Sequence, residues 1–278
     1  MKVAEILEVE GCRLVEPSFS DLAVDSCTLL LLRIAPDEGR LLVDEKEEPI
    51  ALALHDDEGW HAASFLFREP TLAAIECFEA VGGEIYQESR ERWLSAVREY
   101  YSTELLATTF PALEDLRHDR EGKIRDLLDE VWGDRAGTPC LDCCCGSGVG
   151  TAALRAGGVR ALAYDNDPAL LALGLSKGRL VPSDTICIDA QKASHYIDPV
   201  PLGAAFMVGE IYSYNTTLWR TIVANLLALT SETLITVGTE EEAARVEEWC
   251  TREGRKTEIF ENRRDPLYDR WCCVAHQM

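Results

Sequence analysis

The fold of this protein is decided by the stretch Leu141-Asp142-Cys143-Cys144-Cys145-Gly146-Ser147-Gly148-Val149-Gly150-Thr151. An apolar run ends in a carboxylate, passes through adjacent cysteines into a glycine-rich turn, and continues into residues that suit the start of a helix. Small residues at Gly146 and Gly148 let the backbone approach a ligand closely, and the free N–H groups of a helix N-terminus favour a polar or negative ligand group. The stretch therefore predicts a strand, a ligand-binding turn and a helix.

Further apolar runs follow the same rhythm along the second half of the chain. Strands are predicted at residues 140–145, 161–164, 185–188, 204–208 and 233–237, with helix-like or mixed segments between them. This alternation indicates a parallel sheet covered on both faces. A helix is predicted at residues 240–252, and strands at 256–261 and 271–275. The segment between the last two strands is too short for a crossover helix, so we expect them to be antiparallel to each other.

Three of the predicted strands end in an aspartate. Asp142 precedes the glycine turn, Asp165 follows 23 positions later, and Asp189 ends the third strand. This spacing is the one at which a second-strand carboxylate accepts hydrogen bonds from ribose hydroxyls. Aspartate is common in loops after strands, so a single one carries little weight. Three at the carboxyl ends of successive parallel strands indicate a ligand site.

A dinucleotide-binding fold is one reading of this pattern. That fold requires Gly-x-Gly-x-x-Gly, but the register that begins at Gly146 places Thr151 where the third glycine or alanine belongs. Its first strand also usually enters the glycine turn without an acidic residue. Neither feature is met here.

The stretch resembles the first motif of the class I S-adenosylmethionine-dependent methyltransferases, in which an acidic residue precedes Gly-x-Gly. The variant Asp-x-Cys-Cys-Gly-Ser-Gly is matched by Asp142, Cys144, Cys145, Gly146, Ser147 and Gly148. The resemblance covers about half of the chain, residues 120–278. It implies an α/β fold with a Rossmann-like seven-stranded sheet, mostly parallel with an antiparallel last strand, and S-adenosylmethionine as cofactor.

The resemblance also implies a role for each matched residue. Asp142 would lie near the methionine amino group, and Asp165 would hold the ribose hydroxyls. A positively charged sulfonium cofactor suits a site lined by carboxylates better than a pyrophosphate does. Cys144 departs from the glycine of the general motif, where small residues are tolerated. The implied cofactor-binding residues are Asp142, Cys144, Gly146, Ser147, Gly148, Asp165, Asn166, Asp189 and Ala190.

The end of the fourth strand is where members of this family differ by substrate. Methyltransferases of base nitrogens or glutamine amides carry Asn or Asp followed by Pro-Pro and an aromatic residue there, and residues 208–215 lack that motif. Glu210 stands at its first position and could accept a proton or position an acceptor. We therefore predict Glu210 and Asn215 as catalytic residues, the alternative being a strand-end carboxylate that binds backbone. Tyr212 and Tyr214 could line the pocket or simply pack.

The cysteines also admit a metal site, which we do not predict. Cys140 and the three cysteines that follow Asp142 could supply thiolates, and Cys272, Cys273 and His276 could supply more. Alternate residues of a strand face opposite sides, and in the family's sheet order the first and last strands are not neighbours. Small buried side chains are the simpler use of these residues.

The first half of the chain has a different organisation. Strands of a small antiparallel sheet are predicted at residues 27–35, 40–43, 49–54 and 60–67, with hairpin turns at 36–39 and 56–59. Helices are predicted at 71–81, 89–108 and 111–131. We expect an N-terminal α+β domain over residues 1–88, a helical connection over 89–135 that covers the cofactor, and the cofactor-binding domain over 136–278.

Charge and cysteine content bear on partners and compartment. The 278 residues carry a net charge of −22, of which −17 falls in residues 1–140. This disfavours nucleic acid without excluding it, and favours a protein side chain or a small molecule as the methyl acceptor. No apolar run is long enough to span a membrane, and adjacent cysteines suit reduced thiols, so we expect a cytoplasmic protein. The sequence leaves the oligomeric state open.

The sequence therefore predicts a methyltransferase with an unidentified acceptor. Two alternatives stay open. One is a methyltransferase-like module that binds the cofactor or a partner without transferring a methyl group. The other is a nicotinamide-dependent oxidoreductase.

Overall fold

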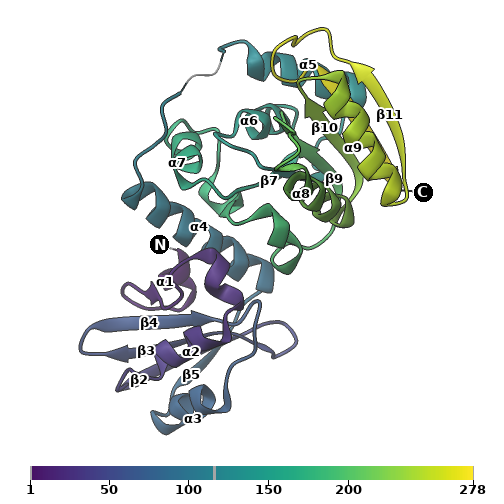
Figure 1. Cartoon of the computed structure of the whole chain (residues 1–278). Coiled ribbons are helices and arrows are strands. Elements are labelled where there is room, and N and C mark those ends of the chain that lie inside the picture. The colour runs from purple at the N-terminus through teal and green to yellow at the C-terminus, as the bar shows by residue number, and fades with distance from the viewer. Residues whose placement is uncertain (1, 115–116, 278) are drawn as a thin grey trace. The chain divides into compact units, whose positions relative to one another are not determined.

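The computed structural model describes residues 2–114 and 117–277 and separates into two compact units, Met1–Glu104 and Leu105–Met278 (Figure 1). Each unit contains its own β-sheet. Within the described ranges, no helix is both long enough and apolar enough to cross a bilayer.

The first unit is built on a five-stranded sheet of order β1-β4-β3-β2-β5. Its three middle strands are antiparallel, as the sequence predicts, whereas the two edge strands pair in parallel with their neighbours. The hairpin between β3 and β4 closes at Gly59, whose φ of +110° favours glycine. The strands are β1 Arg13–Leu14, β2 Glu38–Val43, β3 Pro49–Asp56, β4 Gly59–Ser64 and β5 Glu84–Gln87.

The strand predicted at residues 27–35 is wrong. The chain there forms the short helices η2 (Asp25–Cys27) and α2 (Thr28–Leu31). Thr28 and Leu31 are buried while Leu29 is 53% exposed, a three-residue spacing that a helix satisfies and a strand does not. The hairpin turn predicted at 36–39 is wrong for a related reason, because β2 has no preceding strand with which to form a hairpin.

The predicted helices of the first unit are confirmed as α3 (Leu72–Ala80) and α4 (Arg90–Thr108), although the last turn of α4 belongs to the second unit. The Thr71 side chain accepts a hydrogen bond from Ala74 N and so caps α3, which ends before Gly82 at a φ of +61°. The short helices α1 (Lys2–Ile6) and η1 (Phe19–Ala23) have no counterpart in the sequence-based expectation.

The second unit is built on a seven-stranded sheet of order β11-β12-β10-β9-β6-β7-β8 (Figure 1). All neighbouring pairs from β10 to β8 are parallel, and β12 is antiparallel to both β10 and β11. The expected fold class is therefore confirmed, including the antiparallel last pair. The strands are β6 Pro139–Cys143, β7 Arg160–Asp165, β8 Thr185–Cys187, β9 Val200–Ala205, β10 Thr230–Val237, β11 Arg255–Glu261 and β12 Trp271–Gln277.

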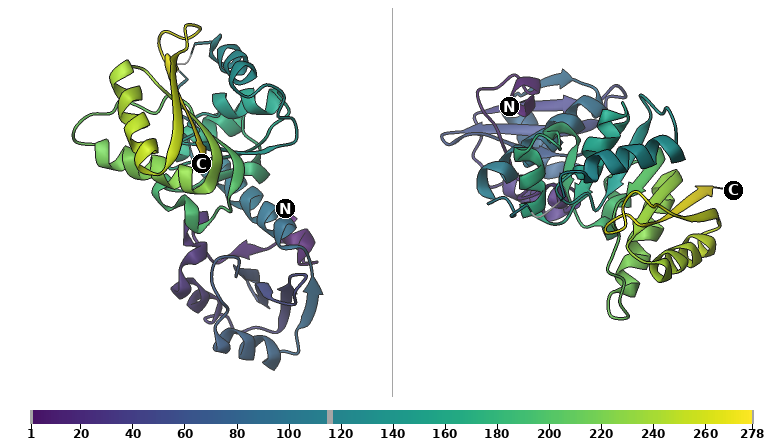
Figure 2. Two further views of the ribbon diagram at one scale, coloured as in Figure 1. Left: turned by 90° about the vertical axis from the view of Figure 1, so that its right-hand side faces the viewer. Right: turned by 90° about the horizontal axis from the view of Figure 1, so that it is seen from above.

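Helices cover both faces of this sheet (Figure 2). Leu202 and Ala204 of β9 share a core with α5 and α6, while Gly203 between them faces α8, where an added Cβ would come within 3.1 Å of Leu226. Alternation along the strand thus places these helices on opposite faces. The helices are α5 Arg120–Val131, α6 Val149–Ala156, α7 Pro168–Ser176, η3 Pro182–Asp184, η4 Ala190–His195, α8 Thr216–Leu229 and α9 Glu240–Arg252.

Two boundaries differ from the sequence-based expectation. The helix predicted from residue 111 begins only at Arg120. Residues 111–114 are not helical, and Leu113, which the apolar pattern predicted on a packed face, is 96% exposed. Residues 115–116 of that prediction lie outside the described residues. The fourth strand, predicted at 204–208, ends at Ala205, since Met207 turns the chain with a φ of +57°.

Candidate functional site

A cavity of about 680 Å³ opens at the carboxyl ends of β6, β7, β8 and β9. This volume lies in the range of small-molecule and cofactor sites. One part of its wall is polar and comes from the loops after the first three of these strands, and the other part is apolar and comes from the chain after β9 and from α8. The lining residues are Leu113, Glu114, Arg120, Asp142, Cys144, Cys145, Gly146, Ser147, Val149, Gly150, Asp165, Asn166, Asp167, Leu170, Leu173, Asp189, Ala190, Gln191, Phe206, Met207, Val208, Leu218, Trp219 and Ile222.

The loop between β6 and α6 forms one wall through three left-handed backbone positions. Cys144, Gly146 and Gly148 have φ values of +54°, +52° and +75°. An added Cβ at Gly148 would come within 2.6 Å of Leu180, so both conformation and space require glycine there. At Gly146 an added Cβ would meet only Leu170, at 3.9 Å, because this backbone faces open space. Cys144 thus takes a backbone conformation that favours glycine.

Asp142 is 1% exposed and lies at the end of β6. Its Oδ2 accepts a hydrogen bond of 2.5 Å from Thr151 Oγ1, whereas its Oδ1 is buried and has no hydrogen-bond partner among the described residues. Burial raises the pKa of Asp142 to about 7, a rise that the Thr151 hydrogen bond and the positive charge of Arg120 limit. A buried carboxylate oxygen without a partner on a cavity wall is suited to a cationic ligand group.

Asp165 ends β7 and connects the two loops that form the polar wall. Its Oδ2 accepts from Gly146 N at 2.8 Å and its Oδ1 accepts from Asp167 N at 2.8 Å. Burial raises the pKa of this carboxyl, while the two backbone N–H groups oppose the rise. Asp165 thus orders the glycine turn and also lines the cavity.

The remaining predicted cofactor residues mostly lie on the same wall. Asn166, Asp189 and Ala190 line the cavity, and Asp189 caps η4 by accepting from Gln191 N at 2.9 Å. Ser147 also lines it, with its Oγ 3.5 Å from Arg179 Nη1. Gly148 lies behind this wall, packed on Leu180.

Glu210 and Asn215, predicted as catalytic, lie on the loop between β9 and α8 and do not line the cavity. Tyr212 Oη donates to Glu210 Oε2 at 2.8 Å, and Asn215 Nδ2 donates to the backbone oxygen of Glu210 at 2.9 Å. The rings of Tyr212 and Tyr214 stack with centroids 5.5 Å apart. In the structure these side chains bind one another, and the apolar residues Phe206, Met207 and Trp219 form the cavity wall instead.

Three charged residues on the wall were missed by the sequence analysis: Arg120, Glu114 and Asp167, the last of which caps α7. Arg120 at the start of α5 and Glu114 in the preceding segment both line the cavity. Glu114 forms ion pairs with Arg179 and with Lys177 of the segment after α7. No local sequence motif indicates a role for Arg120 or Glu114, because the partners of each residue are distant in the sequence.

The cysteines of this region form no metal centre in the described part of the chain. Across residues 2–114 and 117–277, no group of three or more His, Cys, Asp or Glu side chains is arranged to hold a metal ion. Burial raises the pKa of the Cys140 thiol and of the Cys145 thiol well above the ordinary value. These thiols are therefore protonated at neutral pH.

Comparison with known proteins gives similarity at the level of structure alone. No protein-family model and no curated protein matches the sequence. A magnesium protoporphyrin IX methyltransferase from Synechocystis PCC 6803, crystallised with bound S-adenosylmethionine, is 14% identical over 66% of this chain and 97% of its own, with a TM-score of 0.47. A TehB-like S-adenosylmethionine-dependent methyltransferase from Corynebacterium glutamicum ATCC 13032 Kitasato is 19% identical over 66% of this chain and 99% of its own, with a TM-score of 0.44.

A third similar structure is an S-adenosylmethionine-dependent methyltransferase from Clostridium acetobutylicum ATCC 824. It is 10% identical over 59% of this chain and 93% of its own, with a TM-score of 0.46. Identities this low concern the arrangement of the chain and not its substrate.

Proposed function

We propose that this protein is an S-adenosylmethionine-dependent methyltransferase that binds its cofactor in the cavity at the carboxyl ends of β6, β7 and β8. The observation that carries the proposal is the composition of the polar wall, where Asp142, Asp165 and Asp189 meet from three successive parallel strands. Ligands of open α/β sheets bind at this edge. Carboxylates favour a cationic sulfonium compound and repel a pyrophosphate.

The residues present fit this cofactor. Asp142 Oδ1 is a buried acceptor that has no partner in the described part of the chain, as a site for an ammonium group requires. The backbone at Gly146 faces open space, so a ligand can lie against it. Thr151 stands where a dinucleotide fold needs its third small residue, and its hydroxyl holds Asp142. The last point disfavours a nicotinamide cofactor.

Catalysis in this proposal consists mainly of positioning. S-adenosylmethionine supplies a methyl group on a sulfonium, which is already a good leaving group, so alignment of an acceptor contributes most of the rate enhancement. Asp142 and Asp165 fix the cofactor-binding wall. Phe206, Met207 and Trp219 form an apolar wall on the acceptor side.

Ligand binding tests the proposal. We expect calorimetry on the full chain to detect S-adenosylmethionine and S-adenosylhomocysteine and not NAD. Asp165→Ala removes the acceptor for Gly146 N and Asp167 N and should weaken binding by at least about 100-fold, since two charge-assisted hydrogen-bond sites are lost. Asp184→Ala, on the exposed end of η3, is the matched control. Unchanged affinity of Asp165→Ala would refute the proposal.

The acceptor is proposed to be a protein side chain or a small molecule. Most of the negative charge lies in residues 1–140, which favours an acceptor with a basic surface and disfavours nucleic acid. Incubation of a cell extract with the full chain and radiolabelled cofactor should place label in protein or in small molecules. Label found in RNA alone would contradict this choice.

A cofactor-binding module without methyl transfer is a second candidate function. The observation that favours it is that the two predicted catalytic residues, Glu210 and Asn215, form hydrogen bonds within their own loop and do not line the cavity. Tight binding of S-adenosylhomocysteine together with no labelled product in any fraction of the extract would select this candidate.

The eleven cysteines are all free, which supports a reducing compartment, and we propose the cytoplasm. We also propose that the acidic N-terminal domain (1–88) recognises the acceptor and that the helical connection (89–135) precedes the cofactor-binding domain (136–278). Labelling of a basic acceptor should then weaken as the salt concentration rises.

A further inference from the structure

Arg120 is a buried cation on the wall of the cofactor cavity. It begins α5, is 8% exposed and lines the cavity, although the polar wall around it is otherwise acidic. Its positive charge acts on Asp142, whose raised pKa it partly lowers, so the two side chains lie within electrostatic reach of each other. An arginine in this position is unnecessary for binding an adenosine group alone.

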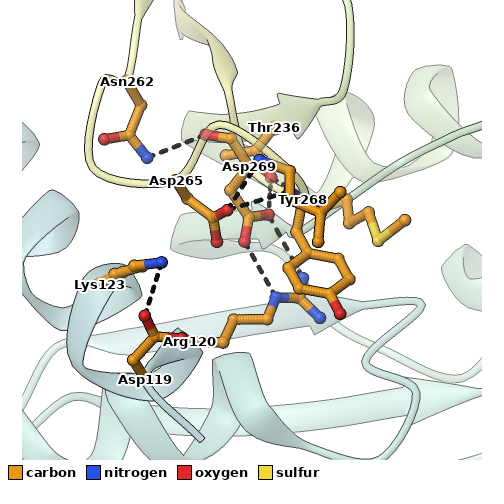
Figure 3. A network of polar contacts seen from close by, with 10 residues as sticks. Asp119, Arg120, Lys123, Thr236, Asn262, Asp265, Tyr268 and Asp269 are labelled. Atoms are coloured by element: carbon orange, nitrogen blue, oxygen red, sulfur yellow. Dashed lines mark hydrogen bonds and ion pairs between the residues drawn. The ribbon is translucent and has the colours of Figure 1, made fainter. Parts of the chain in front are cut away.

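The guanidinium is held in place by a network from three other segments (Figure 3). Nε and Nη2 of Arg120 donate to the two carboxylate oxygens of Asp269 at 3.1 and 3.3 Å, and Thr236 Oγ1 donates to the same carboxylate at 2.6 Å. The Tyr268 ring lies 4.8 Å from the guanidinium carbon. Thr236 Oγ1 in turn accepts from Met207 N, at 2.7 Å, on the cavity wall. The side chain is thus fixed before any ligand arrives.

One edge of this fixed guanidinium has no partner. Nη1 of Arg120 makes no hydrogen bond to any residue that the structure describes, although Nε and Nη2 are both paired. Asp142 lines the same cavity, and its buried Oδ1 accepts no hydrogen bond from any described residue. One wall therefore presents an anionic acceptor and a cationic donor, each with bonding capacity left.

These two groups match the two charges of a free α-amino acid. An ammonium group satisfies Asp142 Oδ1, and a carboxylate satisfies a guanidinium edge, which is the group that arginine binds best. We propose that Asp142 and Arg120 together recognise the amino-acid end of the cofactor, Arg120 through its carboxylate, with Asp269 as the residue that positions Arg120. This inference rests on the proposed function of the cavity.

The ligand pair S-adenosylhomocysteine and 5′-methylthioadenosine tests it, because the second compound keeps the adenosine and the sulfur and lacks the amino and carboxylate groups. Affinities are measured by calorimetry on the full chain. Arg120→Gln should weaken binding of S-adenosylhomocysteine about 10- to 100-fold and change that of 5′-methylthioadenosine less than about twofold. Asp269→Asn should act in the same direction with a smaller loss.

Two further variants keep the test decisive if Arg120→Gln misfolds. Arg120→Lys keeps the charge and should lose affinity for S-adenosylhomocysteine by a smaller factor, so it decides the question if Arg120→Gln does not fold. Arg263→Gln is the control. Arg263 lies in the same connection between β11 and β12 as Asp269, its side chain is 89% exposed, and its substitution should leave both affinities unchanged. Thermal unfolding of each variant reports its folding.

The possible outcomes separate the inference from the function on which it rests. If neither compound binds the wild-type chain, the proposed function fails. If both bind, and Arg120 variants weaken both equally or weaken neither, the proposed function stands and the role of Arg120 is refuted. Selective loss of S-adenosylhomocysteine in the Arg120 and Asp269 variants supports it.

Discussion

Arg68 in the first unit and Arg120 in the second are both 8% exposed and both paired with a buried carboxylate, yet they differ in what they leave free. Arg68 donates from Nε to Thr28 Oγ1 at 3.1 Å, from Nη1 to the Leu22 oxygen at 2.7 Å, and from Nη2 to Glu16. Arg120 uses two of its three nitrogens, both toward Asp269.

The difference separates a structural ion pair from a candidate binding group. Arg68 ties together the segments around η1, α2 and β4, and every nitrogen of its guanidinium has a partner. Arg120 is held as firmly, but on a cavity wall and with one nitrogen to spare. Burial of a charge therefore does not identify a functional residue, whereas remaining bonding capacity beside a cavity does.

The largest expected effect is that of Arg68→Gln. This change leaves Glu16 buried without its cation, and removal of one partner of a buried pair typically costs about 3–5 kcal/mol of unfolding free energy. Urea denaturation measures the loss, and Arg33→Gln, at an exposed position, is the control. Affinity for S-adenosylhomocysteine should stay within about twofold of wild type while the protein is folded. A loss of affinity in the folded variant would mean that Arg68, like Arg120, affects ligand binding.

Thr28→Val should have a smaller effect on the same pair. The substitution keeps the shape of the side chain but removes the acceptor for Arg68 Nε, at a cost of about 1–3 kcal/mol for a buried donor left unsatisfied. Thr28→Ser retains the hydroxyl and should recover most of that stability. Equal unfolding free energies for both variants would mean that the hydroxyl contributes nothing to holding Arg68.

The pH dependence of ligand binding tests the cavity wall of the second unit, where Asp142 and Arg120 lie. Asp142 has a pKa of about 7 in the folded protein, raised by burial from 3.8, so it becomes charged as the pH rises through 7. Affinity for S-adenosylhomocysteine should therefore increase up to about tenfold between pH 6 and pH 8, because its ammonium group prefers the ionised carboxylate. The affinity for 5′-methylthioadenosine should not change with pH, and Asp142→Asn should remove the pH dependence of S-adenosylhomocysteine binding.

The raised pKa of Asp142 has the opposite effect on the ligand-free protein, whose stability should fall as the pH rises. A carboxyl with a raised folded pKa binds more protons in the folded than in the unfolded state, so its contribution to stability is lost as the pH rises from about 4 to about 7. Asp142→Asn should make the ligand-free protein more stable at pH 8 and change it little at pH 4. A variant less stable than wild type at pH 8 would contradict the assignment.

Glu210→Gln is expected to have the smallest effect on ligand affinity. Glu210 lies outside the cavity and its carboxylate accepts from Tyr212, a bond that Gln can preserve. Calorimetry should show less than about a twofold change for S-adenosylhomocysteine. A loss of tenfold or more would show that Glu210 itself contacts the ligand.

Sequence reasoning succeeded where a pattern is local. The alternation of apolar runs located all seven strands of the second sheet, because each buried parallel strand is a short continuous apolar segment. The turn between strand and helix that Gly146 and Gly148 predicted is also present, and the structure adds that both residues have left-handed backbone. Sequence reasoning failed at residues 27–35. A leucine-rich run of this length fits a helix and a strand equally, and only the burial of Thr28 and Leu31 selects the helix.

The site shows the same division between local and remote information. Asp142, Asp165 and Asp189 were found because each ends a strand. Arg120 was missed because its partner Asp269 is 149 residues away, and no local pattern marks an arginine that a distant loop will hold against a cavity.

The thiols that follow Asp142 should make this site resistant to oxidation and alkylation. The hydrogen bond between the Cys143 and Cys144 thiols, together with burial, raises the pKa of Cys144 well above its ordinary value, and burial does the same for Cys145. Peroxides and alkylating agents attack thiolates, and these side chains are almost wholly protonated near neutral pH. Residues that elsewhere act as oxidation sensors serve here as small, inert spacers, so oxidative stress should leave ligand binding intact long after exposed thiols have reacted.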